Sequence, residues 1–230
     1  MPLGVITGAS RGLGRATALA LAARGWDLVV DARDTTALDR AVAEFRSRGG
    51  PGTQVLAVPG DVGEPSHRAT LARVARTLGP VDLLVNNASL LGPMPPLAEY
   101  PLHRLASVLA VNVLAPLGLT QLLLDSLGTV VNVSSDAAVE AYPQWGGYGA
   151  SKAALDQLSA VLAVERADLR VYAFDPGDMR TAMHQEAFPG EDISDRPEPE
   201  TVVPALLRLV EERPPSGRYR ASELLAGVGA

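Results

Sequence analysis

The residues best suited to chemistry in this chain are a tyrosine and a lysine, Tyr148 and Lys152, four positions apart. In a helix this spacing puts both side chains on one face, about one turn from each other. A free tyrosine titrates near ~10, and a neighbouring ammonium favours the phenolate. The pair therefore predicts a tyrosine whose pKa is lowered enough for acid or base work near neutral pH.

Ser135 is a second candidate for the same reaction. It follows the apolar run 129–133, so Ser134 and Ser135 are expected at the carboxyl end of a strand. From there its hydroxyl could hydrogen-bond the substrate oxygen that Tyr148 protonates. A tyrosine and a lysine at this spacing are more often two points on a solvated helix face, so the assignment depends on the rest of the chain.

A glycine-rich turn near the N-terminus predicts a phosphate-binding site. It follows the apolar run 3–6 and precedes a helical pattern rich in Ala and Leu. Glycines let the backbone approach a pyrophosphate at a helix start, where unpaired amides and the helix dipole favour negative charge. The alternative is an ordinary strand-to-helix turn. The residues expected to hold a dinucleotide here are Gly8, Ser10, Arg11, Gly12, Leu13 and Gly14.

The end of the second predicted strand indicates which dinucleotide is bound. An NAD-binding fold places a carboxylate there on the ribose hydroxyls, but in this chain the position falls on Ala32. Alanine cannot accept those hydrogen bonds, whereas Arg33 and Arg11 could neutralise a 2′-phosphate. NADP(H) is therefore favoured. NAD(H) stays open, because Asp31 and Asp34 flank the position and would reach it if the register shifted by one.

Polar residues also follow the third and fourth predicted strands. Asp61 and Val62 are expected to contact the adenine, and Asn87 and Ala88 lie where open α/β sheets bind ligands. Asn112 stands in an apolar stretch of a predicted helix. A buried amide needs partners, so it either cross-links the core or holds a water in a polar path to the site.

The alternation of apolar strands and helical patterns predicts the fold. This order is typical of a doubly wound parallel sheet with helices on both faces, here of about seven strands in one domain, residues 1–230. An irregular segment, about 183–200, is expected to be a mobile lid or substrate loop. The predicted strands are 3–6, 27–32, 53–59, 81–85, 129–133, 169–174 and 217–221. The predicted helices after the first are 35–48, 66–78, 102–126, 146–166 and 200–212.

Composition excludes several classes of function. Hydrophobic residues make up 47% and aromatics 4%, which indicates an aliphatic core. The net charge of -6, without a long basic cluster, argues against a nucleic-acid partner. No cysteine is present, and the three histidines match no metal-binding spacing, so no metal site is expected. His67 and His103 are expected on helix surfaces.

The sequence gives no reason to expect a membrane protein. It begins with an apolar strand rather than a leader segment. The apolar run 114–127 is interrupted by Gln121 and Asp125, and it is too short to span a bilayer. A buried helix and a cytoplasmic protein are therefore expected.

With these motifs in order, the chain resembles the short-chain dehydrogenase/reductase family over nearly its whole length. The matching features are the glycine turn, Asp61-Val62, Asn86-Asn87-Ala88, Asn112, Ser135, Tyr148 with Lys152, and Pro176-Gly177. The resemblance implies a single-domain Rossmann fold and a carbonyl-alcohol oxidoreductase. It also implies that the helices carrying Asn112 and Tyr148 join subunits into a homodimer or homotetramer.

The resemblance also implies roles for individual residues. Tyr148 would exchange the proton, and Ser135 would polarise the carbonyl. Lys152 would lower the pKa of the tyrosine and hold the nicotinamide ribose, while Asn112 would support a water relay. Ser89 departs from the family pattern, which usually has glycine there. The residues expected to border the nicotinamide are Pro176, Gly177, Met179 and Thr181.

The sequence therefore predicts an NADP(H)-dependent carbonyl reductase or alcohol dehydrogenase. The residues expected to border the substrate are largely apolar, which favours a hydrophobic or aromatic carbonyl compound. Two alternatives stay open: an NAD(H)-dependent enzyme, and a non-catalytic dinucleotide-binding regulator. The substrate-bordering residues are Leu90, Leu91, Met94, Ala137, Tyr142, Trp145, Met179, Met183 and Phe188.

Overall fold

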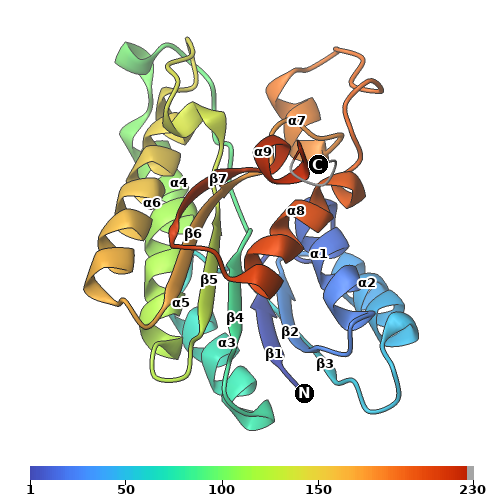
Figure 1. Ribbon diagram of the computed structural model, residues 1–230. Helices are drawn as coiled ribbons and strands as arrows, with labels where there is room; N and C mark the ends of the chain where they lie inside the picture. The colour runs from blue at the N-terminus through green and yellow to red at the C-terminus, as the bar shows by residue number, and fades with distance from the viewer. Residues whose placement is uncertain (227–230) are drawn as a thin grey trace.

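The strands form one sheet in which neighbouring strands run parallel (Figure 1). The computed structural model describes residues 1–226, and within them the strands lie in the order β3-β2-β1-β4-β5-β6-β7. Because the order reverses between β1 and β4, the carboxyl ends of these two strands form the switch point where open α/β sheets bind ligands. The strands are β1 (Leu3–Ile6), β2 (Asp27–Ala32), β3 (Val55–Pro59), β4 (Leu83–Asn86), β5 (Thr129–Val133), β6 (Arg170–Asp175) and β7 (Gly217–Arg220). The predicted doubly wound, seven-stranded, single-domain sheet is confirmed.

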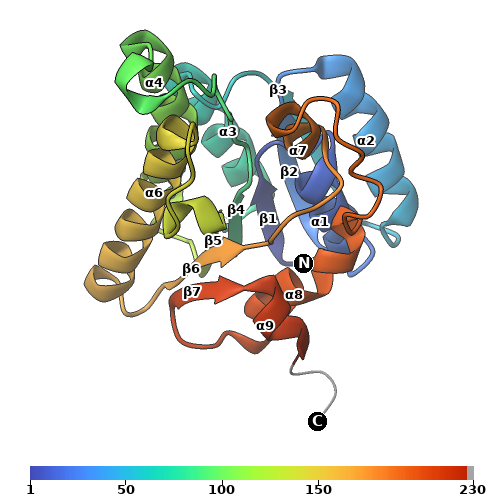
Figure 2. The same cartoon turned by 90° about the horizontal axis from the view of Figure 1, so that it is seen from above.

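Helices cover both faces of this sheet. Figure 2 shows α3, α4 and α6 on one side and α1, α2 and α8 on the other. The helices are α1 (Gly12–Ala22), α2 (Thr35–Arg48), α3 (Pro65–Leu78), α4 (Leu102–Leu109), α5 (Ala115–Leu123), α6 (Gly146–Glu165), α7 (Ala182–Ala187), α8 (Pro199–Glu212) and α9 (Ala221–Ala226). The single-turn 3-10 helices are η1 (Leu97–Glu99) and η3 (Asp136–Ala138).

Two apolar cores lie on the two faces of the sheet. One contains Phe45 of α2 and Leu206 of α8, and the other contains Leu71 of α3 and Leu119 of α5. Strands β1, β4 and β5 are buried along their whole length, as expected for a parallel sheet covered on both faces. The rigid cores hold the carboxyl ends of the strands, and the loops that follow them, in fixed positions.

The helix that carries Asn112 is continuous but irregular. α4, a π-helical turn (Ala110–Leu114) and α5 together span Leu102–Leu123. This helix is long and apolar enough to cross a membrane by length and composition, although 39% of its apolar window is buried within the protein. The expectation of a buried helix over 114–127 is wrong in part, because the helix ends at Leu123 and Leu114 is 56% exposed.

The predicted strand and helix boundaries differ from the structure by a few residues. β3 starts at Val55 and β4 at Leu83, two residues after the expected starts. The irregular segment 183–200 begins inside a short helix, α7, whose first turn is capped by the side chain of Thr181. Ala221, expected in the last strand, begins α9.

Candidate active site

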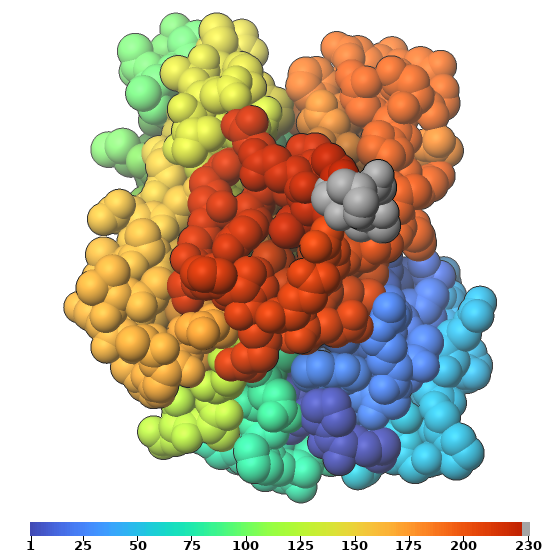
Figure 3. Space-filling view, in the orientation of Figure 1, coloured from blue at the N-terminus to red at the C-terminus, as the bar shows by residue number. Residues whose placement is uncertain are grey.

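One long cavity connects the glycine turn to Tyr148. Its volume is about 690 Å³, within the range of ligand sites. Figure 3 shows a notch at the top of the molecule, between the green and yellow surface at the start of α4 and α6 and the orange surface around α7. Every residue predicted to bind the cofactor lines the cavity except Gly14, and the catalytic candidates line it except Asn112.

The glycine turn is shaped to receive an anion. Gly8 and Gly12 have φ of 67° and 58°, which favour glycine. In the part of the chain that the structure describes, no side chain caps the first turn of α1, so its backbone amides are available to a phosphate. Gly14 has a different role: an added Cβ would lie 2.5 Å from the carbonyl oxygen of Gly8 and would overlap the Asn87 amide. Gly14 therefore permits close packing under the turn rather than contact with a cofactor.

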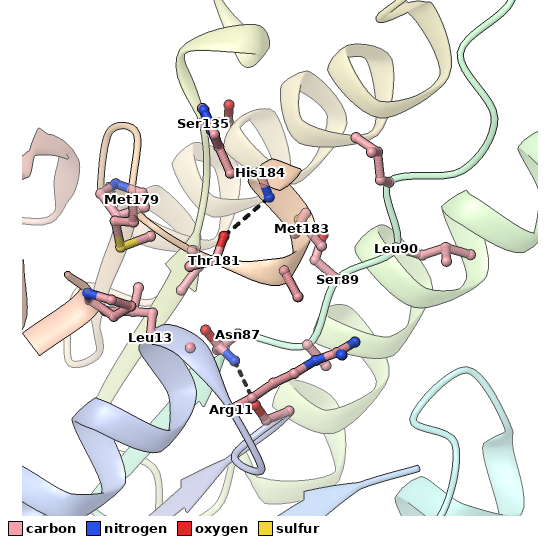
Figure 4. Close-up of a pocket in the computed structure, with 18 of the residues that line it drawn as sticks. Arg11, Leu13, Asn87, Ser89, Leu90, Ser135, Met179, Thr181, Met183 and His184 are labelled. Carbon is pink, nitrogen blue, oxygen red and sulfur yellow. Dashed lines mark hydrogen bonds between the residues drawn. The ribbon is translucent and has the colours of Figure 1, made fainter. Parts of the chain in front are cut away.

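Asn87 holds the glycine turn against the end of β4. Its side-chain amide donates to the carbonyl oxygens of Thr7 at 2.8 Å and Gly8 at 3.2 Å. The hydroxyl of Thr7 in turn accepts the backbone N–H groups of Asn87 and Ala88, both at 3.0 Å. Figure 4 shows Asn87 beside Arg11 and Leu13 at one end of the pocket, with Ser135 at the other.

The part of the cavity lined by Ala32, Arg33, Asp61 and Val62, called the adenosine end below, is the expected place of the adenosine. Ala32 pairs with Pro59 and is the last residue of β2, so the predicted end of this strand is confirmed, while its place beside the ribose stays a prediction. The exposed Arg33 lines the wall beside it.

The two acids that could have reversed the NADP(H) prediction already have structural partners. Asp34 caps α2 by accepting the amide of Ala37 at 2.9 Å. Asp31 accepts the amide of Gly8 at 2.8 Å and lies 3.0 Å from His67 Nε2. The expectation of a surface position for His67 is wrong, because its side chain is only 9% exposed.

Tyr148 and Lys152 share one face of α6, as predicted. The ammonium of Lys152 lies 5.4 Å from the centroid of the Tyr148 ring. Both residues are buried, and Lys152 Nζ donates to the carbonyl oxygen of Val133 at 2.7 Å. Lys152 is also the only lysine in a chain with 20 basic residues. Arginine stays charged in proteins, so a lysine is the basic residue that can titrate here.

Burial dominates the titration of both side chains. It raises the pKa of Tyr148 to about 12, while the neighbouring hydroxyls of Ser135 and Ser89 act in the opposite direction. Burial also lowers the pKa of Lys152 to about 8, against the charge of Asp156. The expectation of a lowered tyrosine pKa is therefore wrong for this protein without cofactor. Desolvation of the phenolate outweighs the effect of the two hydroxyls.

Ser135 follows β5 and faces the cavity near Tyr148. Its hydroxyl donates to the Asp136 carboxylate at 2.8 Å and accepts the amide of Ala137 at 3.2 Å. The Ser135 proton must therefore turn from Asp136 to reach a substrate oxygen. Ser89, the departure from the family pattern, lies beside the same phenol and was not predicted as a site residue.

Asn112 cross-links the structure behind the site. Its Oδ1 accepts from the Leu90 amide at 2.8 Å and the Ser89 hydroxyl at 3.2 Å. Its Nδ2 donates to the Leu90 carbonyl at 3.0 Å and the Ser151 hydroxyl at 2.9 Å. An amide side chain offers two donors and two acceptor positions, so these four bonds use all of them. Of the two alternatives left by the sequence, the side chain makes the cross-link, and a water relay stays a prediction.

A charged cluster behind Ser135 was not predicted. Arg218 of β7 donates to Asp156 at 3.1 Å, to Asp175 at 2.8 Å and to the Ser135 carbonyl oxygen at 3.0 Å. Asp175 also accepts the amide of Gly177 at 3.0 Å. Arg218 thus links the serine loop to the loop expected beside the nicotinamide. The sequence held one signal for this cluster: Asp156 stands four residues after Lys152, so both lie on the same face of α6.

The segment after β6 forms the other wall of the pocket. Figure 4 shows Met179, Thr181, Met183 and His184 on it, with the dashed bond from the His184 amide to the Thr181 hydroxyl at 3.2 Å. The base of the predicted lid is held in place, because Arg180 donates to the carbonyl oxygens of Ser194 and Pro197.

Seven of the nine predicted substrate residues line one of two hollows, and Met94 and Phe188 line neither of them. Leu90, Leu91, Trp145, Met179 and Met183 line the cavity. Ala137 and Tyr142 instead line a second, more open hollow on the outside of α6. The hydroxyl of Tyr142 hydrogen-bonds Asp136 and Glu140, and its contact with a substrate stays a prediction.

Comparison with known proteins agrees with this geometry. A model of the short chain dehydrogenase family matches residues 4–192. The uncharacterized oxidoreductase YciK of Escherichia coli K12 is 33% identical over 213 residues, 90% of this chain and 84% of that protein. Sepiapterin reductase of Rattus norvegicus is 37% identical over 200 residues, 80% of this chain and 76% of the relative.

A solved structure shows the same fold. The short chain dehydrogenase of Shigella flexneri 2a complexed with NADP matches with a TM-score of 0.89 and 30% identity, covering 96% of this chain and 97% of the other. The sequence match, the shared fold and the Ser135, Tyr148 and Lys152 geometry lead to one conclusion: the chain belongs to the short-chain dehydrogenase/reductase family of oxidoreductases.

Proposed function

We propose that this oxidoreductase uses NADP(H) to interconvert a carbonyl compound and its alcohol. One observation carries the proposal: Tyr148, Ser135 and the buried Lys152 line the same cavity as the glycine turn. A dinucleotide lying along that cavity would have its phosphates at the start of α1 and its nicotinamide beside Tyr148. When bound, NADP(H) supplies or accepts the hydride.

In the direction of reduction, Tyr148 donates the proton. With a pKa raised to about 12, its phenol is protonated at neutral pH and ready to act as an acid. The Ser135 hydroxyl turns from Asp136 to the carbonyl oxygen and polarises it. The positive charge of Lys152, 5.4 Å from the phenol ring, stabilises the phenolate left after proton transfer.

The preference for NADP(H) is supported by charge at the adenosine end. Arg33 and Arg11 line the wall, and Ala32 offers no acceptor for a ribose hydroxyl. The Shigella flexneri relative was solved with NADP. NAD(H) is the second candidate, and the two are separated by comparing dissociation constants for NADPH and NADH. We expect Arg33→Ala to weaken NADPH binding and to leave NADH binding nearly unchanged.

An apolar and aromatic pocket supports a hydrophobic or aromatic substrate. The Trp145 ring lies 5.8 Å from the Tyr148 ring and 5.8 Å from the Phe188 ring, measured between centroids. Leu91 and Met183 pack in the same cluster. Such a pocket binds an apolar carbonyl compound more favourably than a sugar phosphate.

The test is the loss of absorbance at 340 nm when NADPH is mixed with a panel of aldehydes, ketones and quinones. Turnover of apolar members supports the proposal. Tight NADPH binding without turnover of any member would favour the non-catalytic regulator, the alternative from another class.

We also propose a cytoplasmic homodimer or homotetramer. Apolar residues are exposed on the two helices expected to join subunits: Leu102 at 79% and Leu114 at 56% on one, Val161 at 41% and Val164 at 84% on α6. Exposed apolar surface of this kind is typical of interfaces. Light scattering coupled to gel filtration gives the number of subunits, and a monomer at micromolar concentration would contradict the proposal.

A further inference from the structure

The adenosine end contains a buried carboxylate, Asp31, whose charge opposes the binding of a 2′-phosphate. The Asp31 side chain is 2% exposed and lines the cavity next to Ala32. It has a structural task, because Oδ1 accepts the amide of Gly8 at 2.8 Å. That bond holds the first glycine of the turn at its φ of 67°. The turn therefore uses a carboxylate at a place where negative charge is unfavourable.

Within residues 1–226, one side chain, His67 of α3, compensates this carboxylate. Its Nε2 lies 3.0 Å from Asp31 Oδ2, and the ring is 9% exposed. The ring occupies the space over Gly60, where an added Cβ would lie 2.6 Å from Cε1. Glycine at position 60 leaves the room that the imidazole needs. The pair is thus built into the wall between β2, the loop after β3, and α3.

We propose that His67 is a specificity-determining residue for NADP(H), acting through Asp31. The inference rests on the NADP(H) preference proposed above. An unpaired carboxylate in a poorly hydrated wall repels a phosphate group several ångströms away far more than it would in water. An imidazole N–H directed at Oδ2 offsets part of that charge. Arg33 and Arg11 then attract the 2′-phosphate with less opposition from Asp31.

The proposal differs from a purely structural role in one measurable respect. If His67 only supported the glycine turn, its loss would weaken NADPH and NADH equally, because both carry the same pyrophosphate. If it compensates charge, its loss weakens NADPH selectively, because only NADPH has the 2′-phosphate. Removing the charge of Asp31 at the same time should then restore NADPH binding.

The experiment compares His67→Leu, Asp31→Asn and the double variant with the unaltered chain. Dissociation constants for NADPH and NADH are measured without substrate, by cofactor fluorescence or calorimetry at fixed ionic strength. We expect His67→Leu to raise the NADPH constant about tenfold and the NADH constant less than about threefold. Asparagine at position 31 keeps an acceptor for the Gly8 amide, so the double variant should bind NADPH about as tightly as the unaltered chain.

Two controls make the outcome decisive. His103→Leu changes an exposed histidine of α4 and should alter neither constant. Melting temperatures without cofactor show whether each variant is folded. Equal weakening of both cofactors by His67→Leu, or no recovery in the double variant, would overturn the inference. An unaltered chain that prefers NADH would instead refute the NADP(H) proposal, and with it this inference.

Discussion

The ammonium of Lys152 donates a hydrogen bond to the carbonyl oxygen of Val133, 2.7 Å away, rather than to the hydroxyl of Tyr148. Strand β5 thus fixes the lysine beside the tyrosine ring and directly ahead of the Ser134-Ser135 segment. The same strand end that presents Ser135 to the cavity also positions the charge on which Tyr148 depends. The three groups are therefore coupled through one strand and one helix.

The first prediction concerns the titration of Lys152. Because it is the only lysine, a protein labelled with ¹³C at lysine Cε gives one side-chain lysine resonance. Burial lowers the pKa from 10.5 to about 8, so this resonance should titrate near that value in the folded protein. A midpoint near 10.5 would contradict the buried position.

The second prediction concerns the stability of the folded protein when Lys152 is replaced. Below about pH 8 the folded protein holds a buried ammonium, and the fall in pKa corresponds to roughly 3 kcal/mol of cost. Lys152→Met removes the cost of the buried ammonium. It also leaves the Val133 carbonyl without its hydrogen-bond donor, which costs about 1 kcal/mol of stability. Urea unfolding at pH 7 should show the variant more stable by roughly 1–2 kcal/mol.

The pH dependence of that difference has a definite sign. Between about pH 8 and 10.5 the unfolded chain holds more protons at Lys152 than the folded one, so the unaltered protein gains stability as pH rises. The advantage of Lys152→Met should shrink over this window. An advantage that grows with pH would show that the folded pKa is not lowered.

The third prediction concerns Arg218. Arg218→Met leaves the carboxylates of Asp156 and Asp175 without their main cation, and we expect a loss of roughly 2–4 kcal/mol in the free energy of unfolding. Turnover should fall by up to about a hundredfold, because the Ser135 loop loses an anchor. Arg218→Lys should recover part of the free energy of unfolding and part of the turnover.

The neighbouring Arg220 supplies the control for that experiment. It is 42% exposed and lies 3.5 Å from Glu140 and 3.8 Å from Asp175, so Arg220→Met should change stability by less than about 0.5 kcal/mol. Equal effects of the two arginine variants would contradict a special role for Arg218.

The fourth prediction compares two glycines. Gly14→Ala places a methyl group 2.5 Å from the Gly8 carbonyl oxygen and should distort the glycine turn. We expect NADPH binding to weaken at least about tenfold. Among the described residues, Gly50→Ala meets no atom within 4 Å, and it should leave the binding unchanged. Isothermal titration calorimetry measures NADPH binding by both variants. Unaltered binding by Gly14→Ala would contradict the prediction and show that the turn tolerates the methyl group.

Sequence reasoning predicted this fold well because its signals are local and repeated. Buried parallel strands such as β1 and β5 appear as continuous apolar runs, and the glycine turn marks where the first helix starts. Lys152 was placed beside Tyr148 because a helix fixes the positions of residues four apart. Each of these inferences needed only neighbouring residues in the chain.

The rest of the site depends on contacts between distant segments, which spacing alone does not reveal. Arg218 reaches Ser135 from the far end of the sequence, and His67 meets Asp31 from another element. The pKa of Tyr148 is raised rather than lowered because burial, which depends on the whole fold, dominates its titration.

The central claim is that Tyr148 transfers the proton in a hydride-transfer reaction, and Tyr148→Phe tests it most directly. The substitution removes one hydroxyl and keeps the ring packed against Trp145, so NADPH binding should persist. With the best carbonyl substrate of the panel, NADPH oxidation at 340 nm should slow by about 10²–10⁴-fold. A Tyr148→Phe protein that binds NADPH and oxidises it at the unaltered rate would contradict the account.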